Sequence, residues 1–309
     1  MGGGTNGAGG TDGAGPMGGG SGSMGGGVKP ILERYRGKVG YAGPQHGKVR
    51  QAKNLIDNVR PNPERLVVIE GIWAHQRAAD CGVAVQSLLV CPEMVHSPEA
   101  LALTERYCSL AEDVYVLSEK VFHRIAERDE PNGLVSICRM PRWGPDDLAV
   151  GAESLILVLD GIEIPGNIGT ILRSADGAGA DGVFICNKRA RVSHPKVVRG
   201  SMGACFKVPI VEWDDPGDAI RWLAGKGYRA YLADTRAERT YREYGYEGRT
   251  AIVSGSERYG IGKAWYSYPG ASLVSIPMRG ICDSLNVAVA TTILAYEAAV
   301  GRRGRDRSG

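Results

Sequence analysis

The chain has few of the features that mark secreted, membrane-bound or metal-binding proteins. It is 309 residues long with seven cysteines, but it has no C-x-x-C pair, and the scattered spacing indicates reduced thiols rather than disulfides or a zinc site. Its five histidines are equally dispersed, so no metal is expected. No apolar run reaches the roughly 18 residues that a membrane span needs. The amino terminus also lacks the charged start and apolar centre of a signal peptide, so we expect a cytoplasmic protein with no membrane contact.

A strong excess of one charge is absent too, because the formal net charge is only +3. Acidic and basic side chains are interspersed almost everywhere, which permits nucleic-acid binding without arguing for it. Residues 28–64 are the exception: this basic lead-in contains the densest run of unbalanced positive charge in the chain. Two interpretations stay open, a solvated helical lead-in and an arm that contacts phosphate.

Large apolar side chains other than three methionines are missing from residues 1–27, and more than half of these residues are glycine. Such a segment buries too little surface to offset its ordering entropy, so it predicts a disordered tail. A mis-assigned start codon would account for it equally well. Residues 304–309 form a short basic tail at the other end. No function is assigned to either tail.

Short apolar strands alternate with helical stretches over residues 65–141, as in RLVVIEG, IWAHQRAADCG and VAVQSLLVC. A further helix is expected over EKVFHRIAERDEPNG. This alternation predicts a small three-layer α/β domain. Residues 142–152 are rich in Pro, Gly and Asp and predict a linker.

The alternation resumes over residues 153–303. The strands VLDG, VFIC and IVSG are apolar throughout, which is typical of a parallel sheet covered by helices on both faces. Helices are expected from about Asn167, near residues 194–204, over residues 216–226 and over the final SLNVAVATTILAYEAAVGRR. The sequence therefore predicts an α/β protein with a parallel-sheet domain after a smaller α/β domain.

Two glycine-rich stretches imitate nucleotide-binding motifs. Gly177–Gly182 has the spacing G-x-G-x-x-G, but it follows a helix and precedes a strand, which inverts the order that a dinucleotide loop requires. We therefore interpret it as a helix-to-strand turn. The stretch GSERYGIGKA lacks the glycine and the hydroxyl of a phosphate loop, because Glu257 and Ala264 stand in their places.

Three other loops have the order that a ligand site needs, since each follows an apolar strand and precedes a helix. They are LVLDGIEIPGNIG, SGSERYGIG and SIPMRGICDSLN. In the first, we expect Asn167 to cap the helix, and Arg173 lies beside its buried stripe. The carboxyl ends of parallel strands are where an α/β sheet collects a ligand, so these loops predict a site.

At these loops the sequence resembles the SpoU/TrmH family of RNA ribose 2′-O-methyltransferases, in the trefoil-knotted SPOUT class. The N-x-G-x-x-x-R frame of the first motif matches Asn167, Gly169 and Arg173. The G-[NS]-E loop of the second matches Gly255, Ser256, Glu257, Gly260 and Gly262. The third, I-P-M-x-G…S-L-N-V-A-x-A, matches Ile276, Pro277, Met278, Gly280, Ser284, Leu285, Asn286, Val287, Ala288 and Ala290.

The resemblance implies a methyltransferase domain with a deep trefoil knot at residues 153–303, preceded by a ribosomal-protein-like RNA-binding domain at residues 65–141. It further implies a homodimer that builds its RNA site across the subunit interface, with no metal. The two-domain layout favours 23S ribosomal RNA as the substrate. The alternatives are a tRNA ribose methyltransferase and a non-catalytic RNA-binding or assembly protein that retains the knot.

The implied cofactor is S-adenosylmethionine, held in a bent form by the backbone of the knotted loops. Glycines at positions 255, 260, 262 and 280 would let the backbone approach the adenosine closely. Apolar side chains would sandwich the adenine. The cofactor-binding residues that the resemblance implies are Ser254, Gly255, Gly260, Ile276, Met278, Gly280, Ser284 and Leu285.

The implied reaction transfers a methyl group to a ribose hydroxyl, a poor nucleophile that loses its proton during the attack. Arg173 would bind the neighbouring phosphate and stabilise the developing alkoxide, because arginine stays protonated in proteins. The residues implied to orient Arg173 and the ribose are Asn167, Glu257, Ser284 and Asn286. Arg199 is a candidate RNA contact, with a plain surface arginine as the equal alternative.

Overall fold

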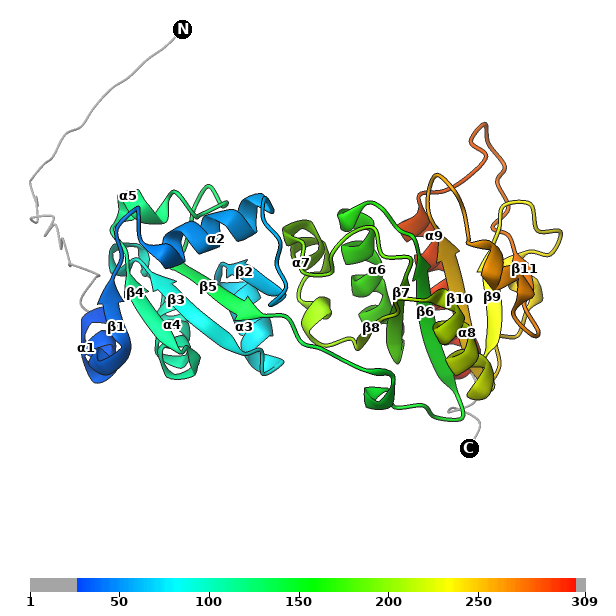
Figure 1. Cartoon of the computed structure of the whole chain (residues 1–309), viewed down its shortest axis with the longest axis horizontal. Coiled ribbons are helices and arrows are strands. Elements are labelled where there is room, and N and C mark those ends of the chain that lie inside the picture. Colours follow the sequence, from blue (N-terminus) through cyan, green and yellow to red (C-terminus); the bar gives the residue numbers. More distant parts are fainter. Residues whose placement is uncertain (1–26, 304–309) are drawn as a thin grey trace, which may run out of the picture.

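The computed structural model describes residues 27–303 and contains two β-sheets, each with helices on both faces (Figure 1). The two predicted tails lie outside the described residues, except for Gly27. Within the described part, no helix is both long and apolar enough to cross a membrane.

The first sheet has five strands in the order β1-β4-β3-β5-β2. Its strands are β1 (Val39–Tyr41), β2 (Leu66–Glu70), β3 (Val85–Val90), β4 (Asp113–Val116) and β5 (Leu134–Arg139). Strands β1, β4 and β3 are parallel, whereas β5 runs antiparallel to both of its neighbours. The helices of this part are α1 (Val28–Arg34), α2 (Gly47–Asp57), α3 (Ile72–Asp80), α4 (Pro98–Leu110) and α5 (Glu119–Phe122).

The two faces of this sheet are buried in separate hydrophobic clusters, because successive strand residues point to opposite sides. Leu88 packs with α1, α3 and α4, whereas its neighbour Leu89 packs with α2 and α5. This part is therefore a three-layer α/β unit, as its sequence predicts. The helix expected over residues 119–133 is shorter than predicted and ends at Phe122, followed by turns.

The basic lead-in, residues 28–64, is built into the first sheet, which corrects its description as a separate segment. Val39 pairs with Val114 through β1, and α2 buries Val49 and Ala52 against the sheet. The sequence concealed this because β1 has only three residues, too few to show an alternating pattern, and α2 has few apolar positions.

The second sheet is entirely parallel, in the order β11-β9-β10-β6-β7-β8. Its strands are β6 (Ser154–Asp160), β7 (Gly182–Cys186), β8 (Ile210–Glu212), β9 (Arg229–Ala233), β10 (Arg249–Gly255) and β11 (Ser272–Val274). Its helices are α6 (Pro165–Ala178), α7 (Pro195–Ser201), α8 (Pro216–Gly225) and α9 (Val287–Arg303). Helices α6, α7 and α9 share one hydrophobic cluster with the sheet, and α8 packs in the cluster on the opposite face.

Helix α6 begins two residues earlier than the sequence suggested. Pro165 occupies its first turn and Ile164 the N-cap position, so the predicted N-cap role of Asn167 is wrong. A proline is favoured there because its fixed φ suits a helix and it lacks the N–H that would stay unpaired. The side chain of Asn167 is therefore available for another partner.

The glycine-rich end of α6 is the helix-to-strand turn that the sequence predicts. Gly179 ends the helix with φ +69°, in the left-handed region that glycine adopts without strain. Gly177 lies inside the helix, where a Cβ would come within 2.4 Å of the Tyr296 hydroxyl oxygen. This glycine thus lets α9 pack closely against α6.

Polar contacts join the two parts of the molecule. Arg65 donates to a Glu212 carboxylate oxygen at 2.9 Å, and both side chains are largely buried. Arg199 of α7 pairs with Glu127 of the first part at 3.1 Å. The connection between the sheets runs along one side of the molecule (Figure 1).

Candidate functional site

A cleft of about 810 Å³ opens where β9, β10 and β11 end. These strands are neighbours in the parallel sheet, so the loops that follow them meet at one edge. The lining residues come from these loops and from the start of α9: Ala233, Asp234, Thr235, Arg236, Ser254, Gly255, Ser256, Glu257, Tyr259, Gly260, Ile261, Lys263, Tyr266, Val274, Ile276, Met278, Asp283, Ser284, Leu285, Asn286, Val287, Ala290 and Leu294.

A chain of hydrogen bonds links the three loops that the sequence singled out. The Asn167 side-chain amide donates to the Glu257 carboxylate at 2.5 Å, and Asn286 donates to the Asn167 carbonyl oxygen at 3.3 Å. The side-chain oxygen Oδ1 of Asn286 accepts from the Ala288 backbone N–H at 2.9 Å, and this bond caps the start of α9. Side chains from α6, from the loop after β10 and from the loop before α9 therefore hold one another at the rim of the cleft.

The loop after β10 folds back on itself at a glycine. Ser256 and Gly260 exchange two backbone hydrogen bonds, of 3.0 and 2.8 Å. A Cβ on Gly255 would lie 2.2 Å from the Gly260 carbonyl carbon, a distance that no side chain can occupy. Glycine is thus required at this position because the backbone of the same loop occupies the space of a Cβ. The sequence had suggested that a ligand occupies this space.

The remaining glycines of the site serve different purposes. A Cβ on Gly262 would meet the Asp160 carboxylate at 2.9 Å, whereas the space beside Gly260 and Gly280 is open. Gly260 lines the cleft and has φ +69°. Gly262 and Gly280 are not among the lining residues. Close approach of a ligand to the backbone is consequently possible at Gly260.

The predicted apolar side chains line the cleft. Ile276 and Met278 follow β11, and Leu285 precedes α9. Deeper in the cleft, the hydroxyl of the buried Ser254 lies 2.7 Å from the Thr291 hydroxyl of α9. Ser284 is exposed and donates to the adjacent Asp283 at 3.1 Å.

Asp160, which the sequence reasoning missed, anchors the loop after β10. It is buried at the end of β6, and its carboxylate accepts from the Gly262 backbone N–H at 2.7 Å and from the Asn187 amide at 2.6 Å. One carboxylate thereby ties together the ends of β6, β7 and β10. An acid directly after an apolar strand, as in VLDG, is the sequence signal that could have revealed it.

Asp234, which directly follows β9, lines the cleft with its carboxylate. The sequence analysis did not single it out either. Arg236 donates two side-chain hydrogen bonds to this carboxylate, at 3.0 and 3.1 Å, and the Tyr266 hydroxyl donates at 3.0 Å. Chiefly because of the hydrogen bonds from Arg236, the pKa of Asp234 falls to about 2. The carboxylate therefore stays ionised at neutral pH.

Neither predicted arginine lies in this cleft. Arg173 is exposed on α6 and lines a separate recess with Trp73, Arg77 and Lys207. Arg199 forms its ion pair with Glu127 between the two parts of the molecule. A single copy of the chain thus brings together Asn167, Glu257 and Asn286 but leaves Arg173 apart from them.

The chemistry of the cleft fits a nucleoside. Apolar side chains suit a flat ring, and the open space beside Gly260 lets such a ring approach the backbone of the loop. The lining holds three carboxylates, on Asp234, Glu257 and Asp283, and two cations, on Arg236 and Lys263, and Arg236 pairs with Asp234. Among residues 27–303, no group of three His, Cys, Asp or Glu side chains is placed to hold a metal ion.

Comparison with known families identifies both parts of the chain. Residues 154–296 match the family described as the SpoU rRNA Methylase family, and residues 47–136 match the family described as the MRM3-like substrate binding domain. The chain is 31% identical over 249 residues to the 23S rRNA (guanosine(2553)-2′-O)-methyltransferase RlmP of Bacillus subtilis (strain 168). That alignment covers 81% of this chain and 94% of the relative.

Solved structures agree with this result. The AdoMet-bound rRNA methyltransferase from Sinorhizobium meliloti superposes with a TM-score of 0.75 at 27% identity, covering 84% of this chain and 97% of that one. The SpoU methyltransferase AviRb from Streptomyces viridochromogenes, in complex with AdoMet, gives a TM-score of 0.71 at 26% identity, with 84% and 98% coverage. These matches span both sheets, so this chain is a member of the SpoU rRNA methylase family.

Proposed function

We propose that this protein is an S-adenosylmethionine-dependent methyltransferase that methylates the 2′-hydroxyl of a ribose in 23S ribosomal RNA. The observation that carries the proposal is the Glu257–Asn167–Asn286 hydrogen-bonded chain at the rim of the cleft. The RlmP relative, named for the same reaction on 23S rRNA, aligns with nearly its whole length.

S-adenosylmethionine supplies an electrophilic methyl group on a sulfonium. Ile276, Met278 and Leu285 would pack against the adenine, and the open space beside Gly260 would let its polar edges approach the backbone of the loop. Ser254, which is buried, and Ser284, which is exposed, would add polar contacts. Gly255 contributes indirectly, since it permits the fold of the loop.

The residues at the rim orient the acceptor ribose. Glu257 accepts from Asn167, which fixes the amide of Asn167, and Asn286 holds the opposite end of that amide. Arg173 binds the phosphate next to the target ribose and stabilises the alkoxide that develops as the hydroxyl loses its proton. Arg199 is occupied by Glu127, which favours a structural role over an RNA contact.

A second copy of the chain brings Arg173 to the site, and the active form is a homodimer. Helix α9 supports this, because Val289, Tyr296 and Val300 are 47%, 47% and 67% exposed and recur at helical spacing. Ile164, beside the start of α6, is 53% exposed. Pairing of these surfaces buries apolar area and sets Arg173 of each copy near the other copy's cleft.

Mixed dimers test this arrangement. A dimer of one Arg173→Ala subunit and one Gly255→Val subunit, isolated through two affinity tags, should retain about half of the wild-type activity, because one composite site stays intact. Each variant alone should be inactive. An inactive mixed dimer would show that Arg173 works within its own subunit and would contradict the composite site.

The chain path supports a trefoil knot in the catalytic domain. β11 lies at the sheet edge beyond β9, whereas α9 returns to pack on β10 and β6. Between β11 and α9, the backbone N–H of Ser275 donates to the Arg239 carbonyl at 3.0 Å, and the Ser275 carbonyl accepts from the Tyr241 N–H at 2.9 Å. The last helix thus passes the segment that joins β9 to β10, and an experimental trace of this region tests whether it is threaded.

The first sheet and its helices form the substrate-binding domain, and residues 153–303 form the catalytic domain. The match of residues 47–136 to a substrate-binding family supports this division. All seven cysteines are free thiols, which fits a reducing compartment such as the cytoplasm.

Incubation with radiolabelled S-adenosylmethionine and total RNA tests the function. Label in 23S ribosomal RNA, mapped to one 2′-O-methylated nucleotide, is the expected result. Label in tRNA instead would make the protein a tRNA methyltransferase. RNA binding without any label would make it a non-catalytic assembly protein and contradict the proposal.

A further inference from the structure

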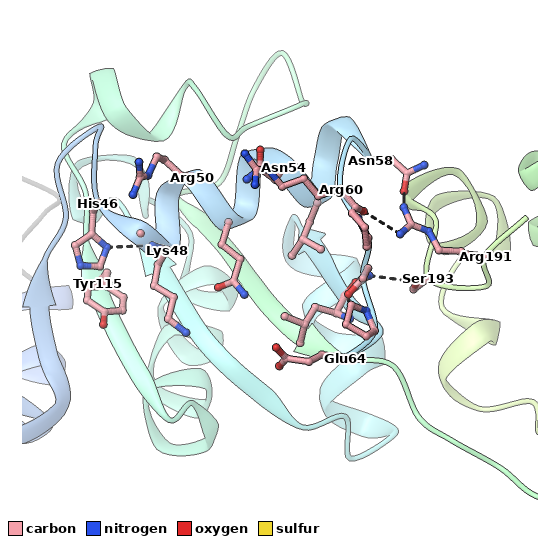
Figure 2. Close-up of a pocket in the computed structure, with 17 residues that line it drawn as sticks. His46, Lys48, Arg50, Asn54, Asn58, Arg60, Glu64, Tyr115, Arg191 and Ser193 are labelled. Atoms are coloured by element: carbon pink, nitrogen blue, oxygen red, sulfur yellow. Dashed lines mark hydrogen bonds between the residues drawn. The ribbon is translucent and has the colours of Figure 1, made fainter.

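A second concave surface, remote from the cleft, runs along α2 (Figure 2). We call it the α2 groove; it has a volume of about 700 Å³. Its walls come from α2, from the loop that follows it, from Tyr115 of β4 and from the loop between β7 and α7. Both parts of the molecule therefore contribute to it, and the proposed reaction does not use it.

The lining carries four cations and a single carboxylate. The cations are Lys48, Arg50, Arg60 and Arg191, and the carboxylate is Glu64. Within residues 27–303, Arg50 and Arg60 have exposed side chains and no ion-pair partner. Lys48 is only partly compensated, by Asp113 at 3.6 Å. The α2 groove thus has an excess of positive charge, and the side chains of Arg50 and Arg60 are accessible to an anion.

Polar amides complete the helical wall. Gln51 and Asn54 line the α2 groove three residues apart, on one side of the helix, and Asn58, the left-handed residue that ends α2, follows them. Val49 and Ala52 on another side of α2 are buried in the core. The helix is thereby held in place by its apolar positions and presents amide donors and acceptors beside the cations.

Arg191 fixes the wall that the second part contributes. It donates to the Arg60 backbone carbonyl at 3.0 Å and also to the Asn58 side chain, as the dashed lines in Figure 2 show. Close by, Asn62 donates to Ser193 at 3.3 Å. The groove is consequently a preformed surface across the junction of the two domains.

An aromatic pair closes the other end of the α2 groove. The rings of His46 and Tyr115 lie with their centroids 4.5 Å apart (Figure 2). His46 also accepts from the Lys48 N–H at 3.3 Å through its side chain, which orients the imidazole at the start of α2. Aromatic rings next to cations offer a base or a ribose a surface to pack on.

We infer that the α2 groove binds the phosphodiester backbone of the RNA substrate. Arginine guanidiniums pair with phosphate oxygens, amides hydrogen-bond sugar hydroxyls and phosphates, and a wide, wet groove suits a hydrated polyanion. The inference rests on the proposed function for the identity of the RNA. It adds that this substrate is held at the domain junction through Arg50 and Arg60, away from the reacting ribose.

The double variant Arg50→Gln/Arg60→Gln tests the inference. Both side chains are exposed and have no ion pair in the described part of the chain, so the fold should be unchanged by circular dichroism. Its matched control, Lys226→Gln/Arg229→Gln, removes the same charge from two exposed side chains, at the residue after α8 and at the first residue of β9. Filter binding to a 23S ribosomal RNA transcript, without cofactor, is measured over a series of KCl concentrations.

The groove variant should bind this transcript about tenfold more weakly than wild type near physiological salt, with a slope of log K against log[KCl] that is shallower by about 2. The control should match wild type. Equal binding by the groove variant and the control, or a loss that is independent of salt, would overturn the inference. Competition by polyglutamate as effective as that by RNA would assign the groove to an acidic protein instead.

Because this assay requires no methyl transfer, it separates the inference from the proposed function. If wild-type protein binds the transcript through the α2 groove but never methylates it, the inference stands and the enzymatic proposal fails. If methylation occurs, the groove variant should raise the KM for RNA and leave kcat and calorimetric S-adenosylmethionine binding unchanged. A fall in kcat alone would place Arg50 and Arg60 in another role.

Discussion

The cleft after β9, β10 and β11 and the α2 groove differ in both packing and charge. At the cleft, the backbone folds so tightly that Gly255 has no room for a Cβ, and the Asp234 carboxylate is nearly buried and paired with Arg236. The α2 groove is formed by long, exposed cations on a helix, with amides between them. A small nucleoside is thus selected by shape, whereas a long polyanion is held by distributed charge. The two kinds of recognition should fail independently.

The largest effect is expected at the tight turn of the cleft. Gly255→Val places side-chain atoms onto the backbone of Gly260, so the loop cannot close. S-adenosylmethionine binding measured by calorimetry should weaken at least about 100-fold, while RNA binding by the α2 groove persists. Gly280→Ala is the matched control, because the space beside Gly280 is open. Undiminished cofactor binding by Gly255→Val would contradict the assignment of the cleft.

A smaller effect is expected at the rim, where Glu257 acts by positioning Asn167. Glu257→Ala should lower kcat about 10- to 100-fold, because the amide of Asn167 loses its fixed orientation. The KM values for RNA and cofactor should change little. Glu257→Gln keeps an acceptor oxygen and should restore most of the activity. If the two variants are equally impaired, the carboxylate charge itself is required, and the positioning role is wrong.

Mild acid should destabilise the first sheet, which carries the α2 groove, before it destabilises the second sheet, which carries the cleft. His75 is fully buried between the Gly71 carbonyl and the Ser136 hydroxyl, and burial lowers its pKa to about 4. An unfolded chain takes up this proton near pH 6.5, so stability is complete above that pH and falls as the pH drops toward 4, by up to about 3 kcal/mol.

Hydrogen exchange at about pH 7 and about pH 4.5 checks this expectation. Opening should increase in α3 and β5, which contain His75 and Ser136, before it increases in β6 and β10 of the second sheet. The variant His75→Gln, which cannot take up the proton, should show a weaker dependence on pH. The same dependence in both proteins would remove His75 as the cause.

The sequence predicted the parts of the fold that depend on local pattern. The apolar strands of the second sheet and the loops after them were visible, and the motif resemblance picked out Asn167, Glu257 and Asn286, which the structure joins by hydrogen bonds. Strand β1 was hidden, because its pairing with β4 depends on residues far away in the chain.

The locations of individual polar groups were harder to predict. Asp160 binds the Gly262 backbone and the Asn187 amide, which lie far away in the chain, and no local pattern encodes those partners. Asp234 pairs with its near neighbour Arg236, but its position in the cleft depends on the order of the strands. Arg173 stands in the expected motif, yet the fold of one chain points it away from the cleft. The role of Gly255 also differed, since its close neighbour is the loop itself.

Asn286 has a consequence for the timing of activity during protein synthesis. It caps α9 and also holds Asn167, and it follows every strand of both sheets along the chain. A nascent chain can therefore complete its first domain, and display the α2 groove, well before the rim of the cleft exists. RNA capture should thus precede methylation competence on the translating ribosome, and a stalled chain ending before α9 should bind RNA without modifying it.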